Sequence, residues 1–473
     1  MSNPGQPHVV VIGGGIAGLA AAFFLREAPC RVTVLEGSPR PGGKLRVSEI
    51  AGVAVDEGAE ALLARRPEGT GLAAAAGLAG QLVWPGTTVA RIWSRGRMCP
   101  LPRRQVLGVP ADLTELAGTG LVSEDGMARA RQDLGLPATG RDGDVPVAGF
   151  VAARFGPEVV DRLVDPLLAA VYAGRSEELS FDATLPALAA ESRKHASLAE
   201  AATAVLPDPA GPGPAATPVF TTLAGGLGTL PAAVAAASGS CVRTGAMVRG
   251  LARTATGWRL TVGSAHDAEY LAADAVILAV PAAPAARLLG GVPGASAAVT
   301  ALQEIRYASM AIVTLAYPAA AFPGPLEGSG YLVPAADGRA VKAVTFSTVK
   351  WPHLADGGAG PVIVRCSLGR VGEEALLQSG DAELAGLAAA DLAAATGASG
   401  APLATRVTRW GGGLPQYTVG HLDRVARIRS AVAAQPGLAV CGAAYDGIGI
   451  PACVATAQAA AAQIAGHLRD DRQ

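Results

Sequence analysis

The chain has 473 residues, a formal net charge of −1, and hydrophobic side chains at half of its positions. This length is enough for two or three domains of ~150 residues, each with its own core. A charge so close to zero creates no field over the whole protein that would attract nucleic acid, so we expect no nucleic-acid partner.

The chain begins with a pattern typical of a nucleotide-binding strand, turn and helix. The apolar run His8–Ile12 leads into Gly13–Gly18, and an alanine-rich apolar segment follows at Leu19–Leu25. The turn has the G-x-G-x-x-G spacing of the dinucleotide fingerprint, which allows backbone to approach a pyrophosphate closely. The pyrophosphate would then lie at the positive N-terminus of the helix.

Two features downstream sharpen this prediction. A second short strand at Arg31–Leu35 ends at Glu36, eighteen residues past Gly18, where a carboxylate can bind both ribose hydroxyls and would repel a 2′-phosphate. A glycine pair follows in the segment Arg40–Lys44, which NAD dehydrogenases do not usually carry. Together these residues resemble the FAD-binding start of the amine oxidase-like flavoprotein superfamily, and the resemblance implies FAD rather than NAD.

The next part of the chain changes from strand to helix patterns. Alternation over Val53–Ala61 predicts a strand that ends in a glycine turn. Residues 110–200 lack strand alternation, and Val159–Leu168 carries apolar residues at helical spacing, so we expect a helical insertion. The proline-rich segment Pro207–Pro214 predicts a mobile loop that closes it.

After this loop the strand pattern of the nucleotide domain returns. The apolar run within Asp274–Pro281 is typical of a buried strand in a parallel sheet that is covered on both faces. We also expect short strands at Val242, Val248 and 258–262, a strand-rich segment over Ala311–Leu368, a strand at Leu438–Gly442, and a helix from about Cys453.

These elements predict a mixed α/β (α+β) fold with three parts. A Rossmann-like FAD-binding domain is assembled from discontinuous segments, and a strand-rich substrate domain and a helical insertion lie between them. The predicted boundaries are 1–65, 218–288 and 405–473 for the FAD-binding domain, 66–108 and 289–404 for the substrate domain, and 109–217 for the insertion. The binding cavity is expected between the domains, where pockets usually form.

The cysteines and histidines favour an intracellular enzyme without a metal. The six cysteines have no paired C-x-x-C spacing and no secretory segment ahead of them, so we expect reduced core thiols and a cytoplasmic location. The six histidines lack the clustering of a zinc site. The uncharged stretch 209–242 is interrupted by prolines and glycines, so we expect no transmembrane helix there.

Three motifs make a family resemblance specific. They are Asp165–Gly174, Gly413–His421 and Gly442–Pro451. Their order and spacing resemble those of the oxygen-dependent porphyrinogen oxidase family, and the likeness covers nearly the whole chain. The segment Val362–Arg370 is more similar to the bacterial coproporphyrinogen-oxidising branch than to the protoporphyrinogen-oxidising one.

The resemblance implies a set of FAD-binding residues. Gly13–Gly18 would hold the pyrophosphate, Glu36 the ribose, Val248 the adenine side and Ile448–Ile450 the isoalloxazine edge. The full set is Gly13, Gly14, Gly15, Ile16, Ala17, Gly18, Glu36, Gly37, Gly43, Lys44, Gly58, Ala59, Glu60, Ala61, Val248, Ala443, Ile448, Gly449 and Ile450.

The resemblance also implies the reaction. Coproporphyrinogen III would be oxidised to coproporphyrin III in haem biosynthesis, with O₂ as acceptor and H₂O₂ as product. A methylene bridge of the macrocycle would lose hydride to flavin N5, and the neighbouring pyrroles would stabilise the resulting cation. No side chain is therefore assigned as a catalytic residue, and the protein supplies orientation, an apolar slot and charge placement.

Charge placement would set substrate choice, because coproporphyrinogen carries four propionates and protoporphyrinogen two. Arg365 is the first candidate for a propionate contact, since it stands mid-strand where an unpaired charge would be costly. Leu332 matches a family position that packs on the macrocycle. Other arginines could also contact propionates, but a solvent-exposed position explains their presence as well or better. They are Arg65, Arg66, Arg91, Arg95, Arg97, Arg103 and Arg104.

One departure from the family concerns Glu60, because some members carry arginine in this turn. A propionate contact is therefore not assigned to Glu60, and we expect it to accept hydrogen bonds from backbone amides near the flavin, or to relay a proton. For Tyr417 and His421 we expect structural rather than catalytic roles. Arg424, Arg427 and Arg429 are expected to be surface charges of a helix.

Other functions stay open at this point. Protoporphyrinogen IX oxidation is the main alternative, and an amine oxidase-like flavoenzyme or a flavin-binding scaffold without turnover are weaker ones. The expected partners are a porphyrinogen, O₂ and, transiently, the next enzyme of the haem pathway. Membrane association is not favoured, because the insertion shows no clear apolar face with basic flanks.

Overall fold

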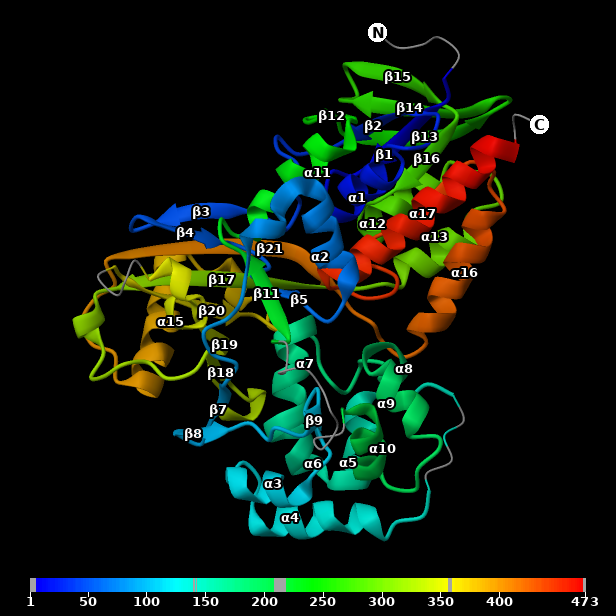
Figure 1. Ribbon diagram of the computed structural model, residues 1–473. Helices are drawn as coiled ribbons and strands as arrows, with labels where there is room; N and C mark the ends of the chain where they lie inside the picture. Colours follow the sequence, from blue (N-terminus) through cyan, green and yellow to red (C-terminus); the bar gives the residue numbers. More distant parts are fainter. Residues whose placement is uncertain (1–5, 139–140, 142, 208–217, 356–359, 471–473) are drawn as a thin grey trace.

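The start of the chain forms the centre of a parallel sheet. The computed structural model describes residues 6–138, 141, 143–207, 218–355 and 360–470. The five strands of this parallel sheet lie in the order β12 (Cys241–Arg243), β2 (Arg31–Leu35), β1 (His8–Ile12), β16 (Ala275–Leu278) and β22 (Leu438–Val440). The strands predicted here are confirmed, and segments far apart in the sequence lie side by side (Figure 1).

Both faces of this sheet are covered, which explains the uninterrupted apolar runs. Val9 and Val11 of β1 pack on one side against α1 (Ile16–Phe24), α11 (Leu230–Ser238) and α17 (Ile450–Asp470). Val10 and Ile12 face the other side. That side is covered by the sheet β13 (Val248–Thr254), β14 (Gly257–Gly263) and β15 (Ala268–Ala273) and by α12 (Ala282–Leu289), α13 (Ser296–Gln303) and α16 (His421–Ala433). The helix expected from about Cys453 begins earlier, at Ile450.

A seven-stranded sheet forms a second layer. Its order is β21 (Ala404–Pro415), β17 (Tyr307–Tyr317), β20 (Val362–Leu368), β19 (Val341–Phe346), β18 (Gly330–Leu332), β7 (Ala90–Ser94) and β8 (Arg97–Pro100), and α15 (Asp381–Thr396) packs against it. The strand-rich segment predicted over 311–368 is confirmed. Strand β21 comes from the segment that the sequence places in the FAD-binding domain, yet it pairs along β17.

The lower part of the molecule in Figure 1 is helical. Its helices are α3 (Leu113–Thr119), α4 (Glu124–Arg131), α5 (Val147–Phe155), α6 (Pro157–Val159), α7 (Asp165–Tyr172), α8 (Phe181–Thr184), α9 (Pro186–Glu191) and α10 (Leu198–Val205). They share one apolar core. The helix predicted at Val159–Leu168 exists, but a π-helical turn at Val160–Val164 joins α6 to α7. The mobile loop predicted at Pro207–Pro214 lies, apart from Pro207, outside the described residues.

Short elements connect these parts. The pair β3 (Val47–Ile50) and β4 (Val53–Asp56) precedes the turn at Gly58. The others are β5 (Leu62–Leu63), β11 (Phe220–Leu223), β6 (Leu82–Val83), β9 (Gln105–Val106), β10 (Val109–Pro110), α2 (Pro67–Ala73) and α14 (Ser347–Lys350). All six cysteines are free thiols, and five are buried as expected, whereas Cys241 is exposed on the edge strand β12.

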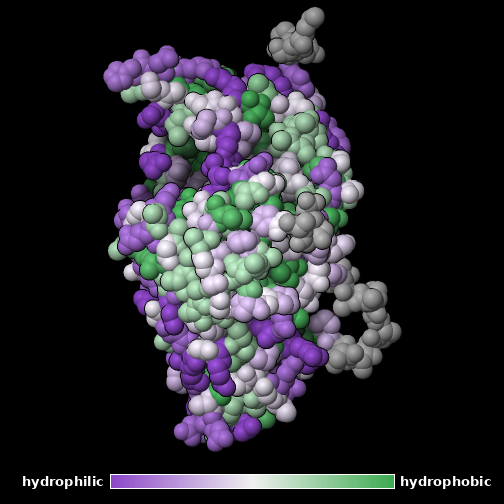
Figure 2. Space-filling view, turned by 90° about the vertical axis from the view of Figure 1, so that its left-hand side faces the viewer, coloured by the Kyte–Doolittle hydropathy of each residue, from purple (hydrophilic) through white to green (hydrophobic). Residues whose placement is uncertain are grey.

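The face drawn in Figure 2 shows no dominant apolar patch among the described residues. Figure 2 shows that the most hydrophilic residues on one face gather toward its two ends, whereas the middle carries mostly residues of intermediate hydropathy. The large apolar side chains that are exposed come from separate segments, such as Trp84, Leu134 and Tyr270.

Candidate functional site

The turn between β1 and α1 can be built only with glycine at two positions. Gly13 has a φ of 109°, and a Cβ there would lie 2.4 Å from the carbonyl oxygen of Ala279. A Cβ on Gly18 would lie 1.9 Å from the carbonyl oxygen of Gly13. Helix α1 therefore packs directly on the strand, and its first turn carries no acidic residue. Its free amides and positive end are suited to an anion.

Glu36 stands directly after β2, close to this turn. One carboxylate oxygen accepts a hydrogen bond from the amide of Gly14 at 2.7 Å, and the other from the amide of Ser38 at 2.8 Å. Both oxygens keep further lone pairs for a ligand hydroxyl. The backbone thus fixes the carboxylate at the cavity wall where the sequence predicts a ribose.

One large cavity extends from this turn to the seven-stranded sheet. Its volume is about 1400 Å³, more than the roughly 300–1,000 Å³ usual for a single ligand, so a cofactor and a second molecule fit together. Of the residues predicted to bind FAD, all but Gly14 and Gly18 line it. Gly14 is turned to Glu36, and Gly18 is packed on Gly13.

The far wall of the cofactor end is the turn that precedes α17. Ile448, Gly449 and Ile450 line the cavity there. The hydroxyl of Tyr417 holds this turn, because it donates to the carbonyl of Ala443 and accepts from the amide of Gly447, both at 2.7 Å.

The ring of His421 packs against the ring of Tyr417. The two rings are stacked with centroids 3.8 Å apart, and Nε2 of His421 donates to the carbonyl of Tyr445 at 2.9 Å. Burial lowers the pKa of His421 to about 4, so the imidazole is neutral near pH 7. These contacts give Tyr417 and His421 structural roles.

Lys44 brings a cation to the middle of the cavity. Burial lowers its pKa. Within the described part of the chain it forms no ion pair, whereas most of the partly buried cations do. An unpaired, desolvated ammonium in this place is suited to an anionic or electron-rich ligand.

The opposite end of the cavity is an apolar slot. Its walls come from the seven-stranded sheet and from α7, which contributes Ala170 and Val171. The apolar lining side chains of the sheet include Met310, Ile312, Leu332 and Ala343, whereas Tyr331 and Val344 face the core on the other side of the sheet. Leu332 is thus on the cavity wall, where the sequence predicts a substrate contact.

Three charged side chains meet at the edge of this slot. Nζ of Lys350 lies 2.7 Å from one carboxylate oxygen of Glu60, and the guanidinium of Arg365 pairs with the other. Arg365 also donates to the carbonyl of Gly58 at 2.6 Å. Burial alone would raise the pKa of Glu60, but the charges of Lys350 and Arg365 outweigh it and lower the pKa to about 2. The cluster therefore carries one net positive charge.

This cluster corrects two expectations. Glu60 accepts hydrogen bonds from Lys350 and Arg365 and not from backbone amides. Arg365 was the first candidate for a propionate contact because its charge was expected to be unpaired. Its charge is in fact paired with Glu60 inside the protein. Arg365 nevertheless lines the cavity beside Lys350.

The other arginine candidates are elsewhere. None of Arg65, Arg66, Arg91, Arg95, Arg97, Arg103 and Arg104, all within the described ranges, lines the cavity. Arg66 pairs with Glu68, Arg91 with Glu327, and Arg95 with Glu158. Arg424 and Arg427 pair with Glu304, and Arg429 with Asp446. The prediction of surface charges fits the exposed Arg427 and Arg429. It is wrong for Arg424, whose side chain is only 15% exposed and donates to the carbonyls of Thr418 and Val419.

Sequence reasoning missed Lys350 and Trp410. Lys350 ends α14, and nothing in the local pattern distinguishes it from a surface lysine. Trp410 lines the cavity from β21, and its indole donates to the carbonyl of Glu57 at 2.9 Å, behind the turn at Gly58. A tryptophan directly before three consecutive glycines, Gly411–Gly413, was the available signal.

The arrangement defines a flavoprotein in which a dinucleotide turn faces an apolar slot. Residues 16–465 match the family described as flavin containing amine oxidoreductase. The chain belongs to this family.

Its relatives include porphyrinogen oxidases. The coproporphyrinogen III oxidase of Mycobacterium tuberculosis is 39% identical over 94% of this chain and 95% of that protein. The coproporphyrinogen III oxidase of Bacillus subtilis is 32% identical over 98% and 99%. A solved structure from Exiguobacterium, provisionally described as a protoporphyrinogen oxidase, has a TM-score of 0.85, 30% identity, and coverage of 98% and 99%.

Among the described residues, no helix is both long and apolar enough to span a membrane. No group of three or more His, Cys, Asp and Glu side chains among them is arranged to hold a metal ion.

Proposed function

We propose that this protein oxidises coproporphyrinogen III to coproporphyrin III with bound FAD, uses O₂ as acceptor and releases H₂O₂. The observation that carries the proposal is the single cavity of about 1400 Å³, which joins a dinucleotide turn to an apolar slot with a cationic edge. The similarity to coproporphyrinogen III oxidases over nearly the whole chain supports it.

The cofactor end fits FAD on the structure's own evidence. Nothing lies within 4 Å of a Cβ built on Gly15, so the turn leaves open space at the free amides of α1. Gly13–Ala17 would hold the pyrophosphate and Glu36 the ribose hydroxyls, with Val248 beside the adenine. Lys44, Gly58–Ala61 and Ile448–Ile450 would surround the ring system. Bound FAD supplies a hydride acceptor and passes the electrons to O₂.

The side chains of the slot bind and orient the macrocycle. Leu332, Ile312 and Ala343, which lie in one row across the sheet, present an apolar surface to a ring-shaped substrate. When these side chains bury the substrate ring, they exclude water and hold a methylene bridge toward the cofactor end. Binding thus supplies the alignment that the reaction needs. No strong base is required, because the pyrroles stabilise the cation that forms.

The charged cluster would receive a propionate. Lys350 and Arg365 carry two positive charges against the one negative charge of Glu60, and both line the cavity. Lys44, Arg249 and Arg287 line the same cavity. A propionate at this edge would gain charge-assisted hydrogen bonds worth ~1.5–3 kcal/mol. Propionates on the other sides of the ring would then point to solvent.

This single cationic cluster also favours a second candidate. Protoporphyrinogen IX has two propionates, and one cluster is enough for a substrate that is charged on one side only. The Exiguobacterium structure is described with that activity.

Aerobic turnover of both substrates by purified, FAD-loaded protein tests the proposal. Porphyrin fluorescence is followed and corrected for spontaneous oxidation, and H₂O₂ is measured in parallel. A higher kcat/KM for coproporphyrinogen III supports the first candidate, and a higher value for protoporphyrinogen IX the second. Absence of turnover on both, with FAD bound, rejects a porphyrinogen oxidase.

The setting of this activity would be cytoplasmic haem biosynthesis. The same assay with the next enzyme of the haem pathway added would detect transient transfer of the product. Sedimentation with and without lipid vesicles measures whether the protein associates with membranes.

A further inference from the structure

A second, much smaller cavity lies directly behind the charged cluster. Its volume is about 20 Å³, and a water molecule needs roughly 10–15 Å³ measured in this way. Glu60 and Arg365 line both this chamber and the large cavity. The chamber is therefore separated from the substrate slot by one carboxylate and one guanidinium.

Polar groups without partners surround this chamber. In the described part of the chain, four buried polar atoms of its lining have no hydrogen-bond partner: Oγ1 of Thr222, Oγ of Ser347, Nε1 of Trp351 and Nε of Arg365. Two of these groups can only donate, and the two hydroxyls donate or accept. A water placed among them satisfies these atoms, and buried waters typically occupy such sites.

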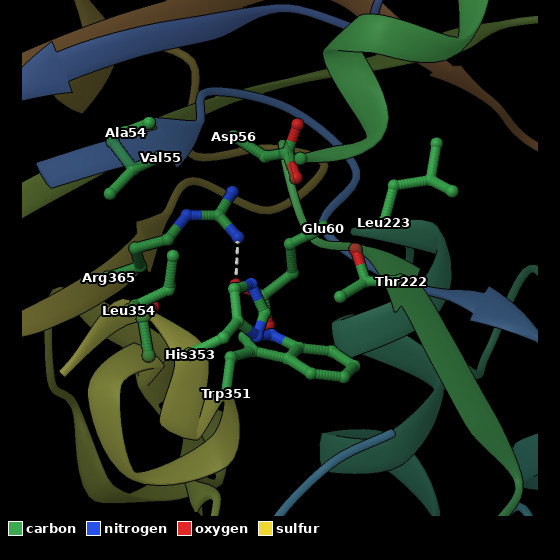
Figure 3. Close-up of a pocket in the computed structure, with 12 residues that line it drawn as sticks. Ala54, Val55, Asp56, Glu60, Thr222, Leu223, Trp351, His353, Leu354 and Arg365 are labelled. Carbon is green, nitrogen blue, oxygen red and sulfur yellow. Dashed lines mark hydrogen bonds and ion pairs between the residues drawn. The ribbon is translucent and has the colours of Figure 1, made fainter. Parts of the chain in front are cut away.

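Asp56 lines the chamber but not the large cavity. It extends from the end of β4, and Figure 3 shows it above the guanidinium of Arg365, with Glu60, Trp351 and His353 around the same space. Its carboxylate accepts from the amides of Leu227 and Gly228, each at 2.9 Å. Leu227 and Gly228 thus hold it in place, while each oxygen keeps a lone pair for water.

His353 connects the chamber to solvent. It lines the chamber together with Trp351, and its ring centroid lies 6.4 Å from that of Trp351. Unlike the other polar lining residues, His353 is exposed. The chamber thus has a wall toward the substrate slot and a titratable side chain at the surface.

The reaction makes such a connection useful, an argument that rests on the proposed function. Each oxidation step removes a hydride from a methylene bridge and one proton from the macrocycle. Over three steps, two of these protons come from pyrrole N–H groups and one from a further methylene bridge. Bound FAD would supply the hydride acceptor, and the reduction of O₂ to H₂O₂ would later take up one proton. A proton must therefore leave the filled slot and become available again in every cycle.

We propose that Glu60, a water in the chamber, Asp56 and His353 form a proton path between the substrate slot and bulk solvent. The carboxylate of Glu60, at the edge of the slot, receives the proton that the macrocycle releases, the water carries it to Asp56, and His353 exchanges it with solvent. Along the path itself, no bond other than N–H and O–H is made or broken. Asp56 holds the proton between transfers, whereas Glu60 holds it only briefly and transfers it to the water.

The electrostatics support this order. Burial raises the pKa of Asp56 to about 6, opposed by its two backbone amides and by the charge of Arg365, and reinforced by the charge of Glu60. The pKa of Glu60 is held near 2. A proton therefore moves downhill from Glu60 to Asp56. Burial lowers the pKa of His353, which favours the neutral, proton-accepting imidazole at neutral pH.

The first test uses a variant that leaves the core intact. In His353→Gln, anaerobic single-turnover reduction of bound FAD should slow by about tenfold, less than the roughly 10²–10⁴-fold of a direct general base. Added imidazole should restore the rate, and the solvent deuterium isotope effect should rise. The matched control is His266→Gln, another exposed histidine that lies far along the chain between β14 and β15. An unchanged rate and isotope effect in His353→Gln overturns the path.

The second test needs no turnover. Infrared spectra of protein labelled with ¹³C at the aspartate carboxyl should show a protonated carboxyl band that titrates near pH 6 and shifts in D₂O. Asp56→Asn should remove it. If that variant does not fold, the wild-type titration still decides, because the absence of a protonated aspartate band between pH 5 and 7 overturns the proposal. If neither porphyrinogen is oxidised, the proposed function fails, while this titration still reports on Asp56.

Discussion

At the nucleotide end of the cavity the walls are mostly backbone, whereas at the substrate end they are side chains from distant segments. The turn after β1 depends on glycines at 13 and 18, and on amides that come from a few neighbouring residues. The edge of the slot depends on Glu60, Lys350 and Arg365, which come from three separate segments. The glycine turn at the nucleotide end has almost no room for added atoms. The substrate end depends on the balance of charge among its side chains.

The largest effect is expected where space is smallest. Gly18→Val should abolish FAD binding, because its side chain would overlap the carbonyl of Gly13, and such overpacking costs about 1–3 kcal/mol or more. The flavin absorbance per protein measures it. Gly71→Ala, on the exposed side of α2 with nothing within 4 Å, should keep its full flavin content. Retention of FAD by Gly18→Val would mean that the turn can rearrange.

The next effect concerns the charge balance. Glu60→Gln should lower the free energy of unfolding at pH 7 by about 3 kcal/mol, since a carboxylate with a pKa near 2 is stabilised over its ordinary 4.5. Because that pKa is depressed, the stabilisation is present above about pH 4.5 and is lost as the pH falls toward 2.

Denaturant unfolding at pH 7 and pH 3 measures this effect. The wild-type protein should lose stability between these two values, and Glu60→Gln should lose much less. Glu27→Gln, which removes an exposed pair with Arg26, is the control and should behave as the wild type. Equal pH dependence in Glu60→Gln and the wild type would show that the cluster does not stabilise the fold.

A smaller effect is expected on substrate binding. Lys350→Gln should raise the KM for coproporphyrinogen III by roughly 10–100-fold, the equivalent of one lost charge-assisted hydrogen bond of ~1.5–3 kcal/mol. The kcat should change less, because Lys350 binds a part of the substrate away from the reacting bridge. Arg91→Gln, which removes a cation paired with Glu327 outside the cavity, should leave both constants unchanged. Equal KM changes in both variants would contradict the assignment.

The smallest effect is expected for a loss of hydrogen bonds at the cofactor end. Tyr417→Phe removes two hydrogen bonds that hold the turn before α17, and should cost ~1–2 kcal/mol. Thermal unfolding with and without added FAD measures the loss, which should be larger for the loaded protein. Tyr270→Phe, at an exposed position of β15, is the control.

The same difference explains what could be predicted from the sequence. The β1 turn and Glu36 were predictable, because a short local pattern fixes both their backbone and their chemistry. The partner of Arg365 was not, since Glu60 lies 305 residues away and only the tertiary fold brings the two together. The expectation that Arg365 was an unpaired cation failed for this reason.

The fold shows a similar division. The buried strands β1, β16 and β22 were visible as apolar runs, and the helical character of the insertion was visible as a lack of alternation. The place of β21 was not predictable, because its pairing with β17 depends on strand register across the sheet and not on local composition. Lys350 was missed because a lysine at the end of a four-residue helix carries no distinguishing signal.

The strand order of the parallel sheet also determines when the protein can acquire its cofactor. During synthesis β1 emerges early, but its neighbour β16 is translated some 260 residues later, and β22 and α17 come near the end of the chain. At ~5–20 residues per second, the nascent pair of β1 and β2 waits many seconds for β16 and β22. Such long-range pairing also folds slowly. FAD loading is therefore a late, post-translational event, and the unloaded chain depends on protection from aggregation until then.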